Sequence, residues 1–218
     1  MLTPHAEEYL EAIYRLGGQD KPVHLSLLAE HLDLTAAAVT EMVRRLAEQG
    51  LVSYTPYRGV KLEEDGLCQA LAVIRRHRLW ERFLTDMLGL SWDVVHDEAC
   101  KLEHAASEAI TERLADLLDQ PESCPHGKPM PLPGCVVVSS GEVISLAALE
   151  SGQGGTVAYV GREEPELLRY LEQLHLFPGT EVTVEQVAPF DGPLTIRVGE
   201  EVSVIGRNVA ETIFMSGS

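Results

Sequence analysis

The sequence predicts a mainly α-helical protein with a β-rich domain at its C-terminal end. Up to about residue 118, apolar residues recur at intervals of three and four, the spacing of one face of a helix. From about residue 141, short β-branched runs separated by glycines replace this pattern, as in small β-barrels. Strands are expected there over residues 155–160, 180–187, 194–198 and 202–205, with one helix over about 164–174. The segment between them has prolines at positions 121, 125, 129, 131 and 133, which prevent regular structure and indicate a domain boundary.

The first 64 residues follow the element order of a winged helix-turn-helix. Pro4 suits a first helical position, Thr35 suits the N-cap of a third helix, and Gly50 suits its end. Three helices and then two short strands are expected, over residues 4–16, 25–32, 36–49, 51–55 and 60–62. Residues 56–59 would form the turn of the wing.

Two long amphipathic helices are expected next, over about 65–88 and 93–118. The first is rich in large apolar side chains, namely Leu79, Trp80, Phe83, Leu84 and Met87. Because this apolar surface exceeds what one small DNA-binding head can cover, we expect a homodimer that forms through these helices.

The third helix is the expected DNA reader. A recognition helix needs short side chains at its N-terminal end, so that it can enter the major groove, and basic residues nearby for phosphates. The candidate contact residues are Thr35, Ala37, Ala38, Thr40, Glu41, Arg44 and Arg45 on the helix, with Arg58 and Lys61 on the wing. The same pattern also fits a winged helix that binds another protein and leaves its basic patch to solvent.

The charge distribution favours regulated binding to double-stranded DNA. The formal net charge of −17 argues against a nucleic-acid partner at first sight. However, residues 1–62 carry six Lys/Arg against eight Asp/Glu, a balance of −2, and the other −15 lies in residues 63–218. An acidic body with a small basic tip would repel DNA until something orients the tips or neutralises carboxylates.

The middle helices carry side chains of the types that bind metals. His96, Cys100, Glu103 and His104 stand at i, i+4, i+7 and i+8, so a helix would project all four from one face. Such a face is costly to bury unless a cation compensates it. Four potential ligands on one stripe therefore indicate a metal site.

Two further pairs are less specific. His77 and Glu81 stand at i, i+4 on the preceding helix, and Glu8 and Glu11 at i, i+3 on the first. Either pair alone also fits an exposed helix face. His126 has no such company in the sequence and is expected to be structural or exposed.

Several segments together resemble the diphtheria toxin repressor family of iron- and manganese-dependent regulators, over essentially the whole chain. They are residues 8–14 (EYLEAIY), 76–83 (RHRLWERF), 96–104 (HDEACKLEH), 124–129 (CPHGKP) and 176–180 (LFPGT). The resemblance implies a winged helix-turn-helix over 1–64, a helical metal-binding and dimerisation domain over 65–130, and a linker over 131–140. An SH3-like barrel over 141–218 would follow, similar to a domain of a ferrous-iron transport accessory protein.

The resemblance also implies two metal sites per subunit. The first would use Glu8, Cys100, Glu103 and His104. The second would use His77, Glu81 and His96, completed from the SH3-like domain by Glu164. Leu167 stands at the position of a second ligand from that domain and cannot ligate, so this role is lost or passes to a neighbour such as Glu163 or Glu166.

The same resemblance bears on the metal and on the operator. Iron-responsive members carry a methionine thioether where this sequence has Glu8, so an oxygen-rich site favours Mn²⁺ over Fe²⁺. A thiolate ligand from Cys100 would instead favour Fe²⁺, Zn²⁺ or Co²⁺, unless the backbone carbonyl of Cys100 ligates in place of its sulfur. Glu41 falls where iron-type members carry a base-contacting amide.

The expected function is a metal-dependent repressor that binds operator DNA as a dimer, in the cytoplasm and without a membrane partner. No apolar run is long enough to span a bilayer, and the N-terminus is too acidic for a signal peptide. The four cysteines show no CxxC pairing and are expected to be thiols or ligands. Two alternatives stay open, a metallohydrolase built on the His/Glu/Cys set and a winged-helix adaptor with a structural metal. No enzyme is expected, since a GxSxG-type nucleophile motif is absent from the sequence.

Overall fold

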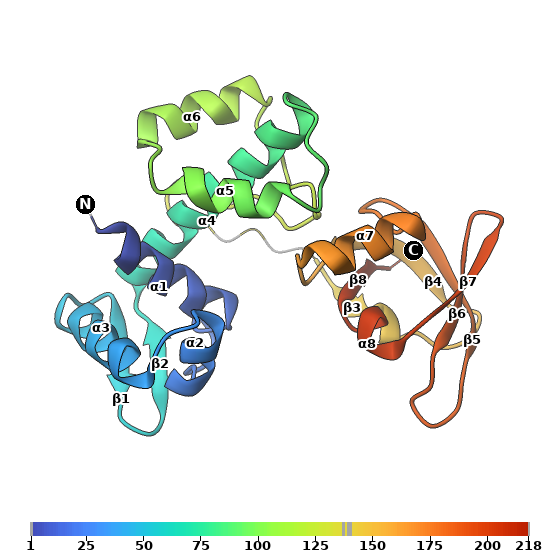
Figure 1. Ribbon diagram of the computed structural model, residues 1–218, viewed down its shortest axis with the longest axis horizontal. Helices are drawn as coiled ribbons and strands as arrows, with labels where there is room; N and C mark the ends of the chain where they lie inside the picture. The colour runs from blue at the N-terminus through green and yellow to red at the C-terminus, as the bar shows by residue number, and fades with distance from the viewer. Residues whose placement is uncertain (1, 137, 139–140, 218) are drawn as a thin grey trace. The chain divides into compact units, whose positions relative to one another are not determined.

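A computed structural model describes residues 2–136, 138 and 141–217 of the chain (Figure 1). These residues divide into two compact units. The first contains residues 2–77, 103–106 and 131–136, and the second contains residues 78–102, 107–130, 138 and 141–217.

The first unit is built on a winged helix-turn-helix, as predicted. It contains α1 (Pro4–Arg15), α2 (Leu25–His31), α3 (Ala36–Glu48) and an antiparallel wing of β1 (Val52–Thr55) and β2 (Gly59–Leu62). The side chains of Thr3 and Thr35 cap α1 and α3 by accepting hydrogen bonds from the amides of Ala6 and Ala38, each at 3.3 Å. Thr35 therefore fixes where the recognition helix begins.

A single hydrophobic core orients α3 within this unit. Val39, Val43 and Leu46 on its inner face are fully buried against side chains of α1, α2 and the wing, including Ile13, Leu28 and Val60. Burying each such side chain contributes about 1.5–3 kcal/mol. The opposite face of α3, with Ala37, Glu41 and Arg44, is consequently held toward solvent.

The helical region departs from the sequence prediction at one point. Helix α4 spans Glu64–Asp86 as expected, but the second predicted helix is two helices, α5 (Val95–Glu103) and α6 (Glu108–Leu117). Ser107 begins α6 by accepting a hydrogen bond from the amide of Ile110 at 3.4 Å. A serine can cap a helix as well as continue one, so hydrophobic periodicity alone did not reveal the break. His104 thus lies just beyond the last residue of α5.

The apolar residues of the predicted dimer surface are partly used inside the subunit. Leu79 packs with Leu114, Ala115 and Met130, and Leu84 packs with α5, so both are buried in the second unit. Among the described residues of the helical region, the exposed large apolar side chains are Met87, Leu88, Val94, Ile110 and Leu117.

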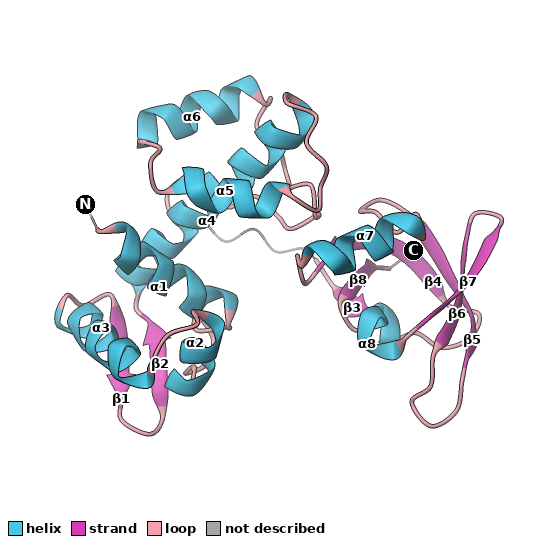
Figure 2. Cartoon of the chain, in the orientation of Figure 1, coloured by secondary structure: helices cyan, strands magenta, loops and turns pink. Residues whose placement is uncertain are grey.

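The C-terminal part is a six-stranded antiparallel sheet with short helical segments beside it (Figure 2). Its strands are β3 (Val143–Ser145), β4 (Gly154–Val160), β5 (Glu181–Val187), β6 (Leu194–Val198), β7 (Glu201–Ile205) and β8 (Ile213–Ser216), in the order β3-β8-β4-β5-β6-β7. The helical segments are the 3₁₀ helix Leu146–Ala148, α7 (Pro165–Gln173) and α8 (Arg207–Ala210). The β-rich prediction is confirmed, although β3, β8 and α8 were not predicted.

The expectation that all cysteines are thiols is wrong for two of them. Cys68 on α4 and Cys135 form a disulfide whose Cα atoms lie 4.7 Å apart. Arg75 of the same helix donates a hydrogen bond to the carbonyl of Pro131 at 3.1 Å. The two cysteines are 67 residues apart in the sequence, so spacing could not reveal the pairing.

Among the described residues, no helix is long and apolar enough to cross a membrane.

Candidate DNA-reading surface and metal centres

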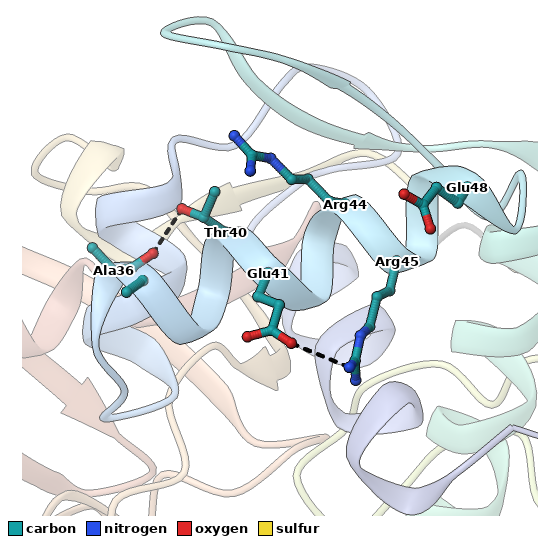
Figure 3. A pocket seen from close by; sticks show the side chains of 7 residues that line it. Ala36, Thr40, Glu41, Arg44, Arg45 and Glu48 are labelled. Carbon is teal, nitrogen blue, oxygen red and sulfur yellow. Dashed lines mark hydrogen bonds and ion pairs between the residues drawn. The ribbon is translucent and has the colours of Figure 1, made fainter.

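The solvent-facing side of α3 borders an open hollow of about 780 Å³ (Figure 3). It is lined by Ala36, Ala37, Thr40, Glu41, Arg44, Arg45 and Glu48. The N-terminal end of the helix contributes only short side chains to it, and the charged ones follow one turn later. This is the arrangement that lets a helix approach the edges of bases in a major groove.

Two internal contacts determine what this surface offers. The Thr40 hydroxyl donates to the carbonyl of Ala36 at 2.7 Å, so its hydrogen is already used within the helix. Glu41 and Arg45 form an ion pair at 3.1 Å (Figure 3). Both side chains are more than half exposed, and such exposed pairs contribute only about 0–1 kcal/mol to stability.

The wing lies beside this surface. Arg44 also lines a second hollow of about 280 Å³, together with His24, Leu25 and wing residues Tyr54, Pro56, Tyr57 and Gly59. Of the predicted wing contacts, Arg58 is exposed and Lys61 is half-buried. Tyr57, which sequence reasoning did not single out, is fully exposed beside Arg58. A tyrosine in a turn gives no periodic signal that would have identified it.

The first metal-binding candidate is the Glu103 cluster, formed by Glu7, Glu11, His77, Glu103 and His104. Glu11 of α1, His77 of α4 and Glu103 of α5 are buried, and their potential ligand atoms all lie within 4.8 Å of one another. His77 Nδ1 lies 2.6 Å from Glu103 Oε2, and His104 Nε2 lies 3.2 Å from Glu103 Oε1. Three segments far apart in the sequence thus converge on one set of imidazoles and carboxylates.

Arginines balance part of the negative charge of the Glu103 cluster. Arg15 donates two hydrogen bonds to Glu11, and Arg76 contacts Glu7 at 2.8 Å. Burial alone would raise the pKa of Glu11, but Arg15 and His77 together hold it below its ordinary value. Burial and the nearby Glu11 carboxylate raise the pKa of Glu103. The two carboxylates therefore disfavour each other's charge, a conflict that a cation would relieve.

The structure places Glu8 differently from the other residues of the predicted first site. Its side chain is half exposed and lies 3.3 Å from His5, whereas Glu7 contacts His104 at 2.8 Å. Residues 7 and 11 are one helical turn apart on α1, so both face the cluster. Glu7 was not predicted from the sequence, because only the packing of α1 shows that it faces His104.

The second candidate is the Glu81 cluster, formed by Glu81, His96, Cys124, His126 and Glu163. Glu81, Cys124 and His126 are fully buried, with potential ligand atoms within 4.8 Å of one another. His96 Nδ1 lies 2.9 Å from Glu163 Oε2 and 3.4 Å from Glu81 Oε1. His126 Nδ1 lies 3.4 Å from Glu81 Oε1 and 4.0 Å from Cys124 Sγ.

A neighbouring carbonyl orients His126. Its Nε2 lies 2.8 Å from the carbonyl oxygen of Trp92, so this nitrogen donates, and Nδ1 is directed at Glu81 and Cys124. Metal-binding histidines are commonly oriented by such a hydrogen bond from their second nitrogen. Lys128 contacts Glu163 at 2.6 Å and supplies one further positive charge.

In the absence of a metal, protonated imidazoles balance the buried carboxylates of the Glu81 cluster. Burial alone would lower the pKa of His96, but hydrogen bonds with Cys100, Glu163 and Glu81 raise it to about 11. Burial alone would also lower the pKa of His126, but hydrogen bonds with Cys124 and Glu81 raise it to about 10. The cluster therefore attracts positive charge strongly.

Two residues of this cluster, Cys124 and His126, were not predicted to be ligands from the sequence. Both lie in the proline-rich segment, where no helical or strand periodicity marks them, and the buried position of His126 excludes the exposed alternative. Glu163, one of the two neighbours expected to take over the role at position 167, lies 2.9 Å from His96, whereas Glu164 pairs with Arg162 at the surface. Cys100 is exposed, with its sulfur 3.8 Å from His96 Nε2.

A winged helix-turn-helix together with two clusters of potential metal ligands, carboxylates and imidazoles in both and a buried thiol in one, defines a class, the metal-responsive DNA-binding regulators. Comparison with protein families agrees over nearly the whole chain. Residues 1–60 match the model "Iron dependent repressor, N-terminal DNA binding domain". Residues 63–132 match "Iron dependent repressor, metal binding and dimerisation domain", and residues 144–216 match the FeoA domain.

Curated relatives and solved structures are similar over their full lengths. The iron-dependent repressor IdeR of Mycobacterium tuberculosis is 33% identical, with 97% of this chain and 96% of the relative covered. The diphtheria toxin repressor of Corynebacterium diphtheriae is 32% identical, with 99% and 91% covered. A manganese-dependent transcriptional repressor in complex with manganese has a TM-score of 0.90 at 33% identity, with 98% of this chain and 100% of that chain covered. The manganese regulator SloR has a TM-score of 0.81 at 32% identity, with both chains covered in full. This chain belongs to the family of iron- and manganese-dependent transcriptional repressors.

Proposed function

We propose that this protein is a Mn²⁺-activated repressor that binds operator DNA as a homodimer through α3 and the wing. The observation that carries the proposal is the Glu103 cluster, which joins α1, α4 and α5 inside the unit that also holds the recognition helix. A metal ion held there would fix α1, on which the helix-turn-helix core packs, against the other two helices. Binding of the metal would thereby select the conformation that fits DNA.

The donor chemistry of the Glu103 cluster supports a hard divalent ion. Its buried potential ligands are the carboxylates of Glu11 and Glu103 and the imidazole of His77, with the imidazole of His104 at its edge. Carboxylate-rich sites suit Mn²⁺, and a bound ion would supply the positive charge that the two carboxylates lack. Glu8 and Cys100, expected from the family pattern, stay candidate ligands that would have to turn toward the site.

The Glu81 cluster is proposed as the second metal site of each subunit. It pairs a thiol with imidazoles and carboxylates, a softer set that also accepts Zn²⁺ or Fe²⁺. Because Glu163 belongs to the C-terminal region and Glu81 and His96 to the helical region, a metal here would stabilise the packing between them within the second unit. Metal binding at the Glu81 cluster would modulate operator binding, whereas metal binding at the Glu103 cluster would determine whether operator binding occurs.

The choice of Mn²⁺ over Fe²⁺ rests on these ligands, since relatives named for each metal are similarly identical to this chain. The measurement is operator binding titrated with Mn²⁺ and, anaerobically, with Fe²⁺. We expect half-maximal binding at a lower free Mn²⁺ concentration. Activation by Fe²⁺ at a markedly lower concentration would overturn the manganese assignment and leave metal activation intact.

Glu103→Gln tests metal activation itself. The amide keeps the shape of the side chain and removes its charge, so metal affinity should fall about 10- to 100-fold and operator binding should need correspondingly more Mn²⁺. The matched control is Glu98→Gln, a half-exposed residue of the same helix that pairs with Lys101 outside the cluster and should bind like the wild type. If chelator-treated wild type binds operator as tightly as the metal-loaded protein, the proposal is wrong. Metal-dependent hydrolysis would favour the metallohydrolase alternative, and binding of a protein partner without DNA binding would favour the winged-helix adaptor.

A further inference from the structure

The DNA-facing surface of α3 is unusual because it carries as many carboxylates as guanidinium groups. Glu41 and Glu48 line the same hollow as Arg44 and Arg45 (Figure 3). Near phosphates a carboxylate is repelled, so an acid in the middle of a recognition helix costs affinity unless it meets a donor in the groove. We propose that Glu41 determines operator specificity by accepting a hydrogen bond from the amino group of a cytosine in each half-site.

The position of Glu41 allows this contact. The buried residues Val39 and Val43 stand two positions before and after it and hold its side toward solvent, where its side chain is 70% exposed. The preceding turn presents only the short side chains of Ala37 and Thr40. Nothing large on the N-terminal side of Glu41 would keep a base edge away from its carboxylate.

The chemistry of the major groove selects cytosine from the four bases. A carboxylate has only acceptors, whereas guanine presents O6 and N7 and thymine presents O4, which are acceptors too. Adenine presents an amino donor, but its acceptor N7 lies beside it and would repel the second carboxylate oxygen. Cytosine presents its N4 amino group without a neighbouring acceptor on the same base, so it is the best partner for an ionised Glu41.

The ion pair with Arg45 supports this role. At 3.1 Å, Arg45 restrains the Glu41 carboxylate and offsets its repulsion from the DNA backbone. The side chain of Arg44 lines both the hollow at α3 and the hollow beside the wing, and it is not paired with Glu41. Its guanidinium can therefore approach phosphate. Arg45 thus restrains the Glu41 carboxylate, Arg44 can contact phosphate, and Glu41 supplies the hydrogen-bond acceptor for the base.

The test is selection of bound sequences from a randomised operator library in the presence of Mn²⁺, followed by competition binding. Wild type should prefer cytosine at one symmetric position of each half-site by about 5- to 100-fold. Glu41→Gln should move that preference to adenine, because an amide both donates and accepts, and Glu41→Ala should abolish it. Glu48→Gln is the matched control: it removes the same charge from the same surface and should retain the cytosine.

This inference rests on the proposed function, and the experiment separates the two. If wild type with Mn²⁺ selects no sequence, DNA binding itself is refuted. If wild type selects an operator and Glu41→Gln selects the same bases at every position, Glu41 is not a specificity determinant. Equal gains in affinity for Glu41→Gln and Glu48→Gln without a change of base would mean that Glu41 acts only through its charge, which also overturns the proposal.

Discussion

At the scale of single residues, several buried charged groups have a specific polar partner. Asp93 illustrates this in the second unit, where it accepts hydrogen bonds from Ser91 at 2.5 Å and from Arg169 of α7 at 3.0 Å. Asp93 is buried while Arg169 is half exposed, so solvent weakens the pair but does not remove it.

The Asp93 contacts predict a pH dependence of stability. The Ser91 hydrogen bond, opposed by burial and assisted by Arg169, lowers the pKa of Asp93 in the folded state. A lowered pKa adds stability above the unfolded value of about 3.9 and loses it as pH falls through the folded value. Asp93→Asn should cost about 1 kcal/mol of unfolding free energy at pH 7, and the difference should shrink toward pH 3. Denaturant unfolding at several pH values measures this.

The exposed pair of Arg162 and Glu164 provides the control. Glu164→Gln should change stability little at any pH, because both side chains are at least half exposed. A constant difference between Asp93→Asn and wild type from pH 3 to 7 would show that the charge of Asp93 does not stabilise the fold.

At the scale of elements, the sequence predicted what local patterns encode and missed what packing decides. The helix-turn-helix, the wing and four strands of the C-terminal sheet follow from periodicity, caps and glycines. The break between α5 and α6 was not predicted, because a serine at position 107 is compatible both with one continuous helix and with the start of a new one. Three contacts join segments far apart in the chain and could not be predicted from local patterns: Glu7 with His104, His126 with Glu81, and Cys68 with Cys135.

The wing depends on one glycine. Gly59 has a φ of +118°, and a Cβ built there would lie 2.4 Å from the carbonyl oxygen of Val23. Gly59→Ala should therefore lower the unfolding free energy by about 2–3 kcal/mol and weaken operator binding through the displaced wing. Gly50→Ala, at φ +74° with open space around the Cβ, should cost only about 1 kcal/mol. Equal losses for the two variants in thermal unfolding would contradict the steric argument.

The disulfide is the element-scale feature that the sequence least suggested. Under non-reducing conditions, digestion should release one peptide pair that contains Cys68 and Cys135, while Cys100 and Cys124 react with alkylating reagent after unfolding. Closing a loop of this length stabilises a fold by up to about 4 kcal/mol in the chain-entropy model, so Cys68→Ser should unfold at lower denaturant. Complete alkylation of all four cysteines in freshly purified protein would show that the bond does not form.

At the scale of the whole molecule, the proposed function requires two copies of the chain. Two heads of a symmetric dimer match successive major grooves about 34–36 Å apart, which one head cannot do. The domain match over residues 63–132 includes dimerisation in its description. Within the described helical region, Ile110 and Leu117 are seven residues apart on α6, on one face, and are 50% and 58% exposed. This face is therefore available for a subunit contact, while Leu79 and Leu84 serve the subunit's own core.

The dimer prediction follows from that face. Each large apolar side chain buried at an interface contributes about 1.5–3 kcal/mol, so charging two of them should raise the dissociation constant at least about 100-fold. Ile110→Glu/Leu117→Glu should sediment as a monomer at micromolar concentration with Mn²⁺ present, while wild type sediments as a dimer. The double variant should also bind single half-sites and full operators with nearly equal, weak affinity. Val202→Glu, at an exposed apolar position on β7, is the control and should stay dimeric. A double variant that sediments as a stable dimer would place the interface elsewhere on the helical region.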